Sequence, residues 1–363
     1  MESFGGSARS RGDMGVLPHA RFFWFVFLTR VKKMNNKFIK GQKAMLEQSK
    51  LFSLAILTLN PCIDNCVYLP PALTPGTIHR VGSSVQDVAG KGLNQALLLR
   101  NLGATVDYFS FGSHAENDAA DAFITAQQIN YHKTPTAAGI RTNLKIIDAN
   151  GVGTEINEKG GPITQSELAA ILAATTAHKG NILSVCGSIP QGVEKSVYRD
   201  IIARAKEQGK ITVLDADGDA LKLGLEARPD YIKPNRRELA GLCDTTEAAL
   251  ADENEVIRHA TRIVEQYGTT VLCTMDEHGS LYVGRDGVWR VGVAKYPLRG
   301  FSGAGDTYLA AFLYARYALD ADIPTALSFA ARASAAKIAL DGTQLPTKEQ
   351  IDAVPKVEVT RVR

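Results

Sequence analysis

The sequence is poor in the features that define disulfide-bonded and metal-binding proteins. Its 363 residues include five cysteines, with no Cys-x-x-Cys pair and no repeated spacing among them. Cys62 and Cys66 lack the neighbouring histidine or second cysteine pair that a zinc site requires. We therefore expect the cysteines to pack in the core and the protein to work in a reducing cytoplasm.

A membrane-spanning run and a strong net charge are also absent. The 45% hydrophobic content suffices for a large core, but the apolar stretch 22–28 has only seven residues, too few to cross a bilayer. Beyond residue 50 the chain carries 31 basic and 35 acidic residues, so its body is mildly acidic. We expect neither a nucleic acid nor a membrane as its partner.

The first 50 residues differ from the body, with ten basic residues against three acidic ones. This segment has the charge of a targeting or membrane-surface segment, although no small-residue cleavage site follows its apolar stretch. The interpretation that we favour is that translation begins at Met34 or Met45. We expect residues 1–50 to be a basic leader that is disordered or not native, and residues 51–363 to form the folded domain.

A glycine-rich stretch near the C-terminus, Arg299-Gly300-Phe301-Ser302-Gly303-Ala304-Gly305-Asp306-Thr307, precedes an apolar helical run. Small residues before a helix leave backbone N–H groups uncovered at the positive end of the helix dipole, which suits the oxygens of a phosphoryl group. A carboxylate at that point, Asp306, predicts a base that accepts a hydroxyl proton during phosphoryl transfer. The alternative is that Asp306 caps the helix, because a four-residue motif is weak by itself.

Two more motifs, Gly90-Lys91-Gly92-Leu93-Asn94 and Lys233-Pro234-Asn235-Arg236-Arg237-Glu238, precede Gly303-Ala304-Gly305-Asp306 in the chain. In this order the three resemble those of the ribokinase-like carbohydrate kinases. Within that family the chain is most similar to the hexose-phosphate branch, the 1-phosphofructokinases and tagatose-6-phosphate kinases. The resemblance runs from about Leu54 into the C-terminal region. It implies an α/β fold with a doubly covered, mostly parallel sheet and a small antiparallel β lid, and the regular strand–helix alternation beyond residue 163 predicts the same kind of sheet.

The lid is expected in two segments, at about 66–88 and 139–160. Both alternate polar and apolar residues without helical spacing, as at Thr77-Ile78-His79-Arg80-Val81 in the first. In the second, Asn150-Gly151 predicts a hairpin turn. Members of the family carry such a lid over the sugar.

The sugar site is expected at the start of the domain. By resemblance Asp64 binds sugar hydroxyls, together with Gly90, Gly92 and Asn94. Lys91 offers a point charge for a phosphate that the substrate already carries. The alternatives are a turn aspartate at position 64 and a surface Gly-Lys-Gly loop, because the spacing is not that of a nucleotide P-loop.

A second group of polar residues, Arg141, Asn143 and Lys145, falls at a period of two, so the three side chains share one face of a strand. Solvent exposure alone would explain such a face. The planar fork of Arg141 suits a phosphate, however, and the Arg-x-Asn-x-Lys pattern resembles the 1-phosphofructokinase version of this segment. We predict that Arg141 and Asn143 belong to the substrate site.

The nucleotide residues are implied by resemblance. Asn235 lies near the nucleotide phosphates, and Glu238 influences Mg²⁺, usually through water, since Mg²⁺ keeps several waters. Capping of a helix by Asn235 is compatible with that role. Asp276 stands where relatives have a glycine. The expected nucleotide-binding residues are Asn235, Thr274, Gly279 and Gly305, with Lys337 and the loop 341–343 near the adenine.

The resemblance implies ATP-dependent phosphorylation of a hexose phosphate, with Mg²⁺ as cofactor. Fructose 1-phosphate is the expected substrate and fructose 1,6-bisphosphate the product. Asp306 would be the base, and the N–H groups of Ala304, Gly305 and Asp306 would stabilise the moving phosphoryl group. Gly303 completes the expected catalytic residues. The alternatives are tagatose 6-phosphate or another sugar, and a sensor without catalysis. Relatives pair through their lids, which implies a possible homodimer.

Overall fold

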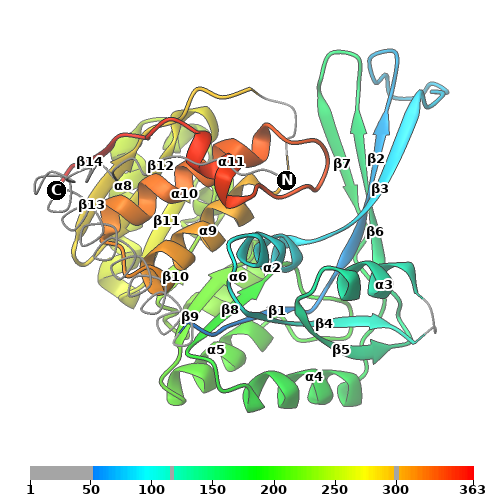
Figure 1. The fold of residues 1–363 in the computed structure, drawn as a ribbon, viewed down its shortest axis with the longest axis horizontal. Coiled ribbons are helices and arrows are strands. Elements are labelled where there is room, and N and C mark those ends of the chain that lie inside the picture. The colour runs from blue at the N-terminus through cyan, green and yellow to red at the C-terminus, as the bar shows by residue number, and fades with distance from the viewer. Residues whose placement is uncertain (1–51, 115–117, 298–301) are drawn as a thin grey trace, which may run out of the picture. The chain divides into compact units, whose positions relative to one another are not determined.

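The computed structural model describes residues 52–114, 118–297 and 302–363, all within one compact unit, Ser49–Arg363. Figure 1 shows the arrangement of these residues. The expected leader, residues 1–50, lies outside the described residues, as do Arg299, Gly300 and Phe301 of the glycine-rich stretch.

A ten-stranded sheet forms the centre of the fold, in the order β14-β13-β12-β11-β10-β9-β8-β1-β4-β5. The strands from β11 to β5 are parallel, whereas β12, β13 and β14 add an antiparallel edge. Strand β1 is buried at every position, as expected for a parallel strand covered on both faces. The strand bounds are β1 Leu54–Thr58, β4 Val106–Ser113, β5 Asn130–Thr136, β8 Ile182–Cys186, β9 Ile211–Asp215, β10 Tyr231–Ile232, β11 Thr270–Thr274, β12 Ser280–Gly284, β13 Gly287–Val291 and β14 Val359–Arg361.

Helices cover both faces of this sheet and divide the core into two apolar clusters. One cluster includes α2, α9 and α10, and the other includes α4, α5, α6 and α8. In Figure 1 α4 and α5 lie below the sheet and α2 lies above it. The helix bounds are α2 Lys91–Asn101, α3 Ala119–Ala126, α4 Gln165–Ala177, α5 Val197–Glu207, α6 Gly218–Leu225, α7 Arg236–Leu242, α8 Glu253–Tyr267, α9 Ala304–Leu313, α10 Ile323–Ile338 and α11 Lys348–Ala353.

The lid is a separate four-stranded sheet in the order β3-β2-β6-β7, with β2 Cys62–Tyr68, β3 Ser83–Ala89, β6 Arg141–Ile147 and β7 Gly153–Asn157. It consists of two antiparallel hairpins joined by a parallel pair, β2 and β6. The hairpin turn predicted at Asn150-Gly151 connects β6 and β7. The alternating residues 77–81, quoted as an example within the first lid segment, belong to the loop between β2 and β3 and not to a strand.

The five cysteines are free thiols. Among the described residues, no helix has both the length and the apolar character that crossing a membrane requires.

Candidate active site

A polar cavity of about 1030 Å³ lies where the carboxyl ends of the parallel strands meet the lid and the N-terminus of α9. Ligand sites of parallel α/β sheets form at this edge, because the connecting loops open there. Three motifs that are far apart in the sequence converge in its lining. The predicted residues that line it are Asp64, Gly90, Lys91, Asn94, Arg141, Asn143, Asn235, Glu238, Thr274, Gly303, Ala304, Gly305 and Asp306.

Gly92 does not line this cavity. It is buried in α2, where a Cβ atom would lie 2.0 Å from Oγ1 of Thr58. The missing side chain allows α2 to pack closely on β1. We therefore replace the predicted sugar contact of Gly92 by a packing role.

The N-terminus of α9 forms a cradle of free amides. Gly303 is the N-cap, with a φ of 80° that favours glycine, and no side chain caps the helix. The first helical N–H bond is donated by Thr307 to the carbonyl oxygen of Gly303, so the three preceding amides have no helical acceptor. Asp306 is the third residue of the helix and not its cap, which excludes the capping alternative.

The carboxylate of Asp306 is buried and faces the amide of Asn94, whose Nδ2 donates to Oδ2 at 2.8 Å. Burial and the neighbouring carboxylate of Asp215 raise the pKa of Asp306, while Lys91, Lys233 and the Asn94 amide oppose that rise. A carboxylate with a raised pKa is a better proton acceptor than an exposed one. The site therefore contains a buried carboxylate beside free helix amides.

Two lysines hold a second buried carboxylate, Asp215, at the end of β9. Its Oδ1 lies 2.8 Å from Nζ of Lys91 and 3.4 Å from Nζ of Lys233. Burial works against ionisation, but Lys233 and Lys91 together hold the pKa of Asp215 below its usual value. Lys91 also lies 3.5 Å from Oε1 of Glu238, so its charge is beside the predicted metal residue.

The lid carries a connected polar face. Asp64 pairs with Asn143 across β2 and β6, and Nδ2 of Asn143 donates to Oδ1 of Asp64 at 3.0 Å. Nζ of Lys145 lies 2.6 Å from Oδ2 of Asp64. Nη1 of Arg141 donates to Oδ1 of Asn143 at 3.0 Å. The predicted shared face is thus confirmed, and it lines the cavity.

The motif at residues 233–238 forms a capping box at the start of α7. Oδ1 of Asn235 accepts from the backbone N–H of Glu238 at 2.8 Å, and Oε2 of Glu238 accepts from the N–H of Asn235 at 2.9 Å. This arrangement leaves Oε1 of Glu238 turned toward Lys91. Capping and a role in the cavity therefore coexist.

A second cavity, of about 550 Å³, adjoins the first and shares Thr274, Asp276, Ala304 and Gly305 with it. Small residues of α10 form one wall, among them Ala331 and Ala335. A wall of small, mostly apolar residues suits a nucleotide base, and the shared residues lead from it to the amide cradle.

The loop from Thr274 to Gly279 closes this second cavity and depends on its backbone. A Cβ atom on Gly279 would lie 2.1 Å from the carbonyl oxygen of Val291, and its φ is 86°. Asp276 has a φ of 51°, a left-handed conformation that glycine adopts more readily than other residues. Lys337, predicted near the adenine, lines neither cavity.

Sequence reasoning did not assign a role to Asp215 or Lys233. Both are buried and lie at the carboxyl ends of neighbouring parallel strands, β9 and β10. Their position after predicted strands could have identified them as site residues, because ligands of parallel sheets bind at the carboxyl ends of the strands. The pairing of Asp215 with Lys91 and Lys233 depends on tertiary contacts that no local pattern reveals.

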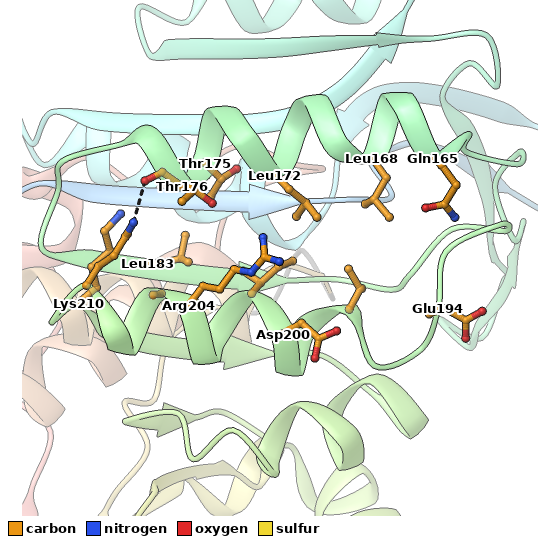
Figure 2. A pocket seen from close by; sticks show the side chains of 14 residues that line it. Gln165, Leu168, Leu172, Thr175, Thr176, Leu183, Glu194, Asp200, Arg204 and Lys210 are labelled. Carbon is orange, nitrogen blue, oxygen red and sulfur yellow. Dashed lines mark hydrogen bonds between the residues drawn. The ribbon is translucent and has the colours of Figure 1, made fainter.

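A third cavity, of about 210 Å³, lies between α4 and α5 and contains no predicted site residue. Figure 2 shows Leu168 and Leu172 of α4, Leu183 of β8, and the polar side chains of Asp200 and Arg204 on α5. We do not include it in the candidate site.

Comparison with known proteins agrees with this geometry. The sequence profile described as "pfkB family carbohydrate kinase" matches residues 57–350. The chain is 30% identical over 315 residues to the 1-phosphofructokinase of Rhodobacter capsulatus, covering 84% of this chain and 96% of the relative. It is 27% identical over 308 residues to the 1-phosphofructokinase of Bacillus subtilis, covering 84% and 99%.

Solved structures confirm the predicted fold. Phosphofructokinase-2 from Escherichia coli superposes with a TM-score of 0.75 at 22% identity, covering 84% of this chain and 98% of that one. Ribokinase from Thermotoga maritima gives a TM-score of 0.66 at 18% identity, covering 83% and 98%. Because the family profile spans most of the chain and its motifs meet in one cavity, the chain belongs to the pfkB family of carbohydrate kinases.

Proposed function

We propose that the protein transfers the γ-phosphoryl group of ATP to the 6-hydroxyl of fructose 1-phosphate, giving fructose 1,6-bisphosphate. Membership of the family implies ATP as the co-substrate. The observation that carries the proposal is the buried carboxylate of Asp306 beside the free amides of α9, in a cavity that the polar face of the lid also lines.

Asp306 performs the proton transfer in this proposal. As the hydroxyl oxygen forms its bond to the γ-phosphorus, the hydroxyl proton passes to Asp306. The bond between the γ-phosphorus and the β,γ-bridging oxygen breaks, and ADP leaves. The amides of Ala304, Gly305 and Asp306 and the ammonium of Lys91 stabilise the charge on the moving group.

The lid holds the sugar phosphate. Asp64 and Asn143 accept and donate hydrogen bonds at the sugar hydroxyls, while Arg141 and Lys145 bind the 1-phosphate. The support is their common face and their place in the cavity lining. Nη1 of Arg141 donates a hydrogen bond of 2.9 Å to the carbonyl oxygen of Glu158, which holds the guanidinium in place. An anchored guanidinium loses less conformational freedom when it binds an anion.

Two acids near Lys91 suit Mg²⁺: Glu238 lines the cavity, and Asp215 is buried beside it. Oδ2 of Asp215 is buried with no hydrogen-bond partner among the described residues, and Nζ of Lys91 lies within ion-pair distance of both Asp215 and Glu238. The described residues contain no group of three His, Cys, Asp or Glu that could hold a metal ion. Mg²⁺ bound with the nucleotide would neutralise charge on the phosphate oxygens, and Asp215 and Glu238 would hold it through its waters.

We also propose a homodimer formed through the lid, working in the cytoplasm. The lid face opposite Asp64 carries apolar side chains at alternate positions, including Ile63, Leu144, Ile146 and the exposed Ile156. A structure of phosphofructokinase-2 from Escherichia coli is described as tetrameric, so assembly occurs in a protein of this fold. Ile156→Lys should yield monomers in analytical ultracentrifugation, and unchanged sedimentation would contradict the lid contact.

A coupled ADP-release assay tests the function. The panel contains fructose 1-phosphate, fructose 6-phosphate, tagatose 6-phosphate and fructose. We expect the highest kcat/KM for fructose 1-phosphate. Preference for another member would reject the substrate, and no turnover with any of them would reject the kinase proposal.

A further inference from the structure

Lys337 is a buried cation that the proposed mechanism does not use. It lies in the last turn of α10, only 1% of it is exposed, and it lines neither of the two adjoining cavities. Its Nζ donates to the carbonyl oxygen of Gly342 at 2.8 Å. Among the described residues no carboxylate lies within ion-pair distance of it, which is unusual for a buried ammonium.

The side chain of Lys337 reaches the residue that begins the amide cradle. A Cβ atom on Gly303 would lie 3.3 Å from Cε of Lys337 and 3.2 Å from Nδ2 of Asn94. Lys337 and Asn94 therefore both pack against Gly303, and Asn94 in turn holds Asp306. A larger residue at position 303 would displace one of them.

The groups around the ammonium of Lys337 stabilise its charge only in part. The negative end of α10 and the Gly342 carbonyl compensate part of the cost of burying the ammonium. The nearby positive end of α9 does the opposite, because it repels a cation. Burial and Lys145 lower the pKa of Lys337, whereas Asp306 and Asp87 oppose that effect. Without a bound anion, the free amides of α9 repel the ammonium of Lys337. Once a phosphoryl anion binds these amides, its attraction to the ammonium offsets that repulsion.

We propose that Lys337 is a positioning residue, which packs against Gly303 and places a positive charge behind the phosphoryl group as it is transferred. The proposal rests on the kinase function proposed above. It makes Lys337 part of the anion site without contact with the substrate.

The first test compares two neutral variants. Lys337→Met keeps the length of the side chain and removes its charge. Lys210→Met is the matched control: Lys210 is also buried, its pKa is also lowered by burial, and its Nζ donates to the carbonyl oxygen of His178 at 2.6 Å. Lys210 lines the cavity between α4 and α5, apart from the candidate site (Figure 2).

We expect Lys337→Met to lower kcat by about 10-fold to 100-fold, less than the loss of about 100-fold to 1000-fold for a donor in direct contact with a developing anion, because Lys337 does not touch the transferred group. KM for fructose 1-phosphate should change little, because Arg141 and Lys145 bind that phosphate. Lys210→Met should leave both constants unchanged. A kcat of Lys337→Met within twofold of the control would overturn the proposal.

Chemical rescue separates positioning by a charge from simple damage. In Lys337→Ala, ammonium or methylammonium ions should restore part of kcat, while tetramethylammonium, which is too large for the vacated space, should not. Failure of both small cations to restore any turnover would assign the loss to damage and overturn the proposal.

Calorimetric titration with ATP and Mg²⁺ keeps this inference distinct from the kinase proposal. If the wild-type protein turns over no sugar, the kinase proposal fails, and the affinity for the nucleotide then decides on Lys337. Weaker binding by Lys337→Met than by Lys210→Met would uphold a cation behind the anion site, and equal binding would reject it.

Discussion

The side-chain amide of Asn94 donates a hydrogen bond of 2.8 Å to Oδ2 of Asp306, across 212 positions of the sequence. The bond joins the first turn of α2 to the first turn of α9. Because the amide occupies Oδ2, and no described residue donates to Oδ1, the second oxygen is available to a substrate hydroxyl. Asn94 therefore orients the proposed base and does not serve the sugar alone.

The first prediction concerns the base itself. Asp306→Asn should lower kcat by about 10²-fold to 10⁴-fold, because it removes proton transfer while keeping the shape of the side chain. The affinity for ATP with Mg²⁺, measured by calorimetry, should change little, since the amide cradle remains. Asp219→Asn, an exposed residue in the first turn of α6, is the control. Normal turnover of Asp306→Asn would remove Asp306 from the mechanism.

The second prediction concerns pH. The base must be ionised, and its pKa is raised by burial and by Asp215, so kcat/KM should fall with decreasing pH before an ordinary aspartate would be protonated. The Asn94 amide stabilises the ionised form, so Asn94→Ala should move this acidic limb to higher pH. Asn101→Ala, in the same helix but bonded to the carbonyl oxygen of Leu345, should leave the profile in place. Coincident profiles for wild type and Asn94→Ala would contradict the assignment.

The third prediction concerns the lid. Arg141→Ala should raise KM for fructose 1-phosphate by about 10-fold to 100-fold, the worth of one or two hydrogen bonds to a charged group. The kinetics with unphosphorylated fructose should be unaffected, because that sugar lacks the phosphate. Arg199→Ala removes an exposed arginine of α5 and serves as the control. An equal loss for both sugars would show that Arg141 supports the lid and does not bind the phosphate.

The fourth prediction concerns Asp215. Asp215→Asn leaves Lys233, which is 5% exposed, without its buried partner, and should lower the free energy of unfolding by about 3 to 5 kcal/mol. It should also raise the Mg²⁺ concentration needed for half-maximal rate. Urea unfolding and a Mg²⁺ titration of the rate measure these effects. Asp244→Asn, which removes an exposed ion pair with Lys222, should change neither quantity measurably.

The sequence contained enough to predict the parallel sheet, the lid and most residues that line the cavity. Continuous apolar runs such as Leu54–Thr58 mark buried parallel strands, and the period of two at Arg141, Asn143 and Lys145 identifies one strand face. These signals are local. They are therefore readable before the chain is folded.

The remaining features depend on contacts between distant segments. The bond from Asn94 to Asp306 and the pairing of Asp215 with Lys91 join elements whose relative position is set only by tertiary packing. The role of Gly92 was missed for the same reason, since Thr58 excludes a side chain there only once α2 lies on β1. Gly92 adjoins Lys91 in the sequence, yet only Lys91 of the two lines the cavity. Neighbouring residues of one motif therefore need not bind the same ligand.

The last prediction concerns Asp276, whose backbone has the φ of 51° that glycine adopts more readily and whose side chain lies where the two cavities adjoin. Asp276→Gly should relieve this backbone strain and remove a negative charge that the nucleotide phosphates approach. We expect a lower KM for ATP and an unchanged KM for fructose 1-phosphate. Asp320→Gly is the matched control, because its φ is 52° and it lines neither cavity. If both variants lower KM for ATP equally, the carboxylate of Asp276 has no part in nucleotide binding.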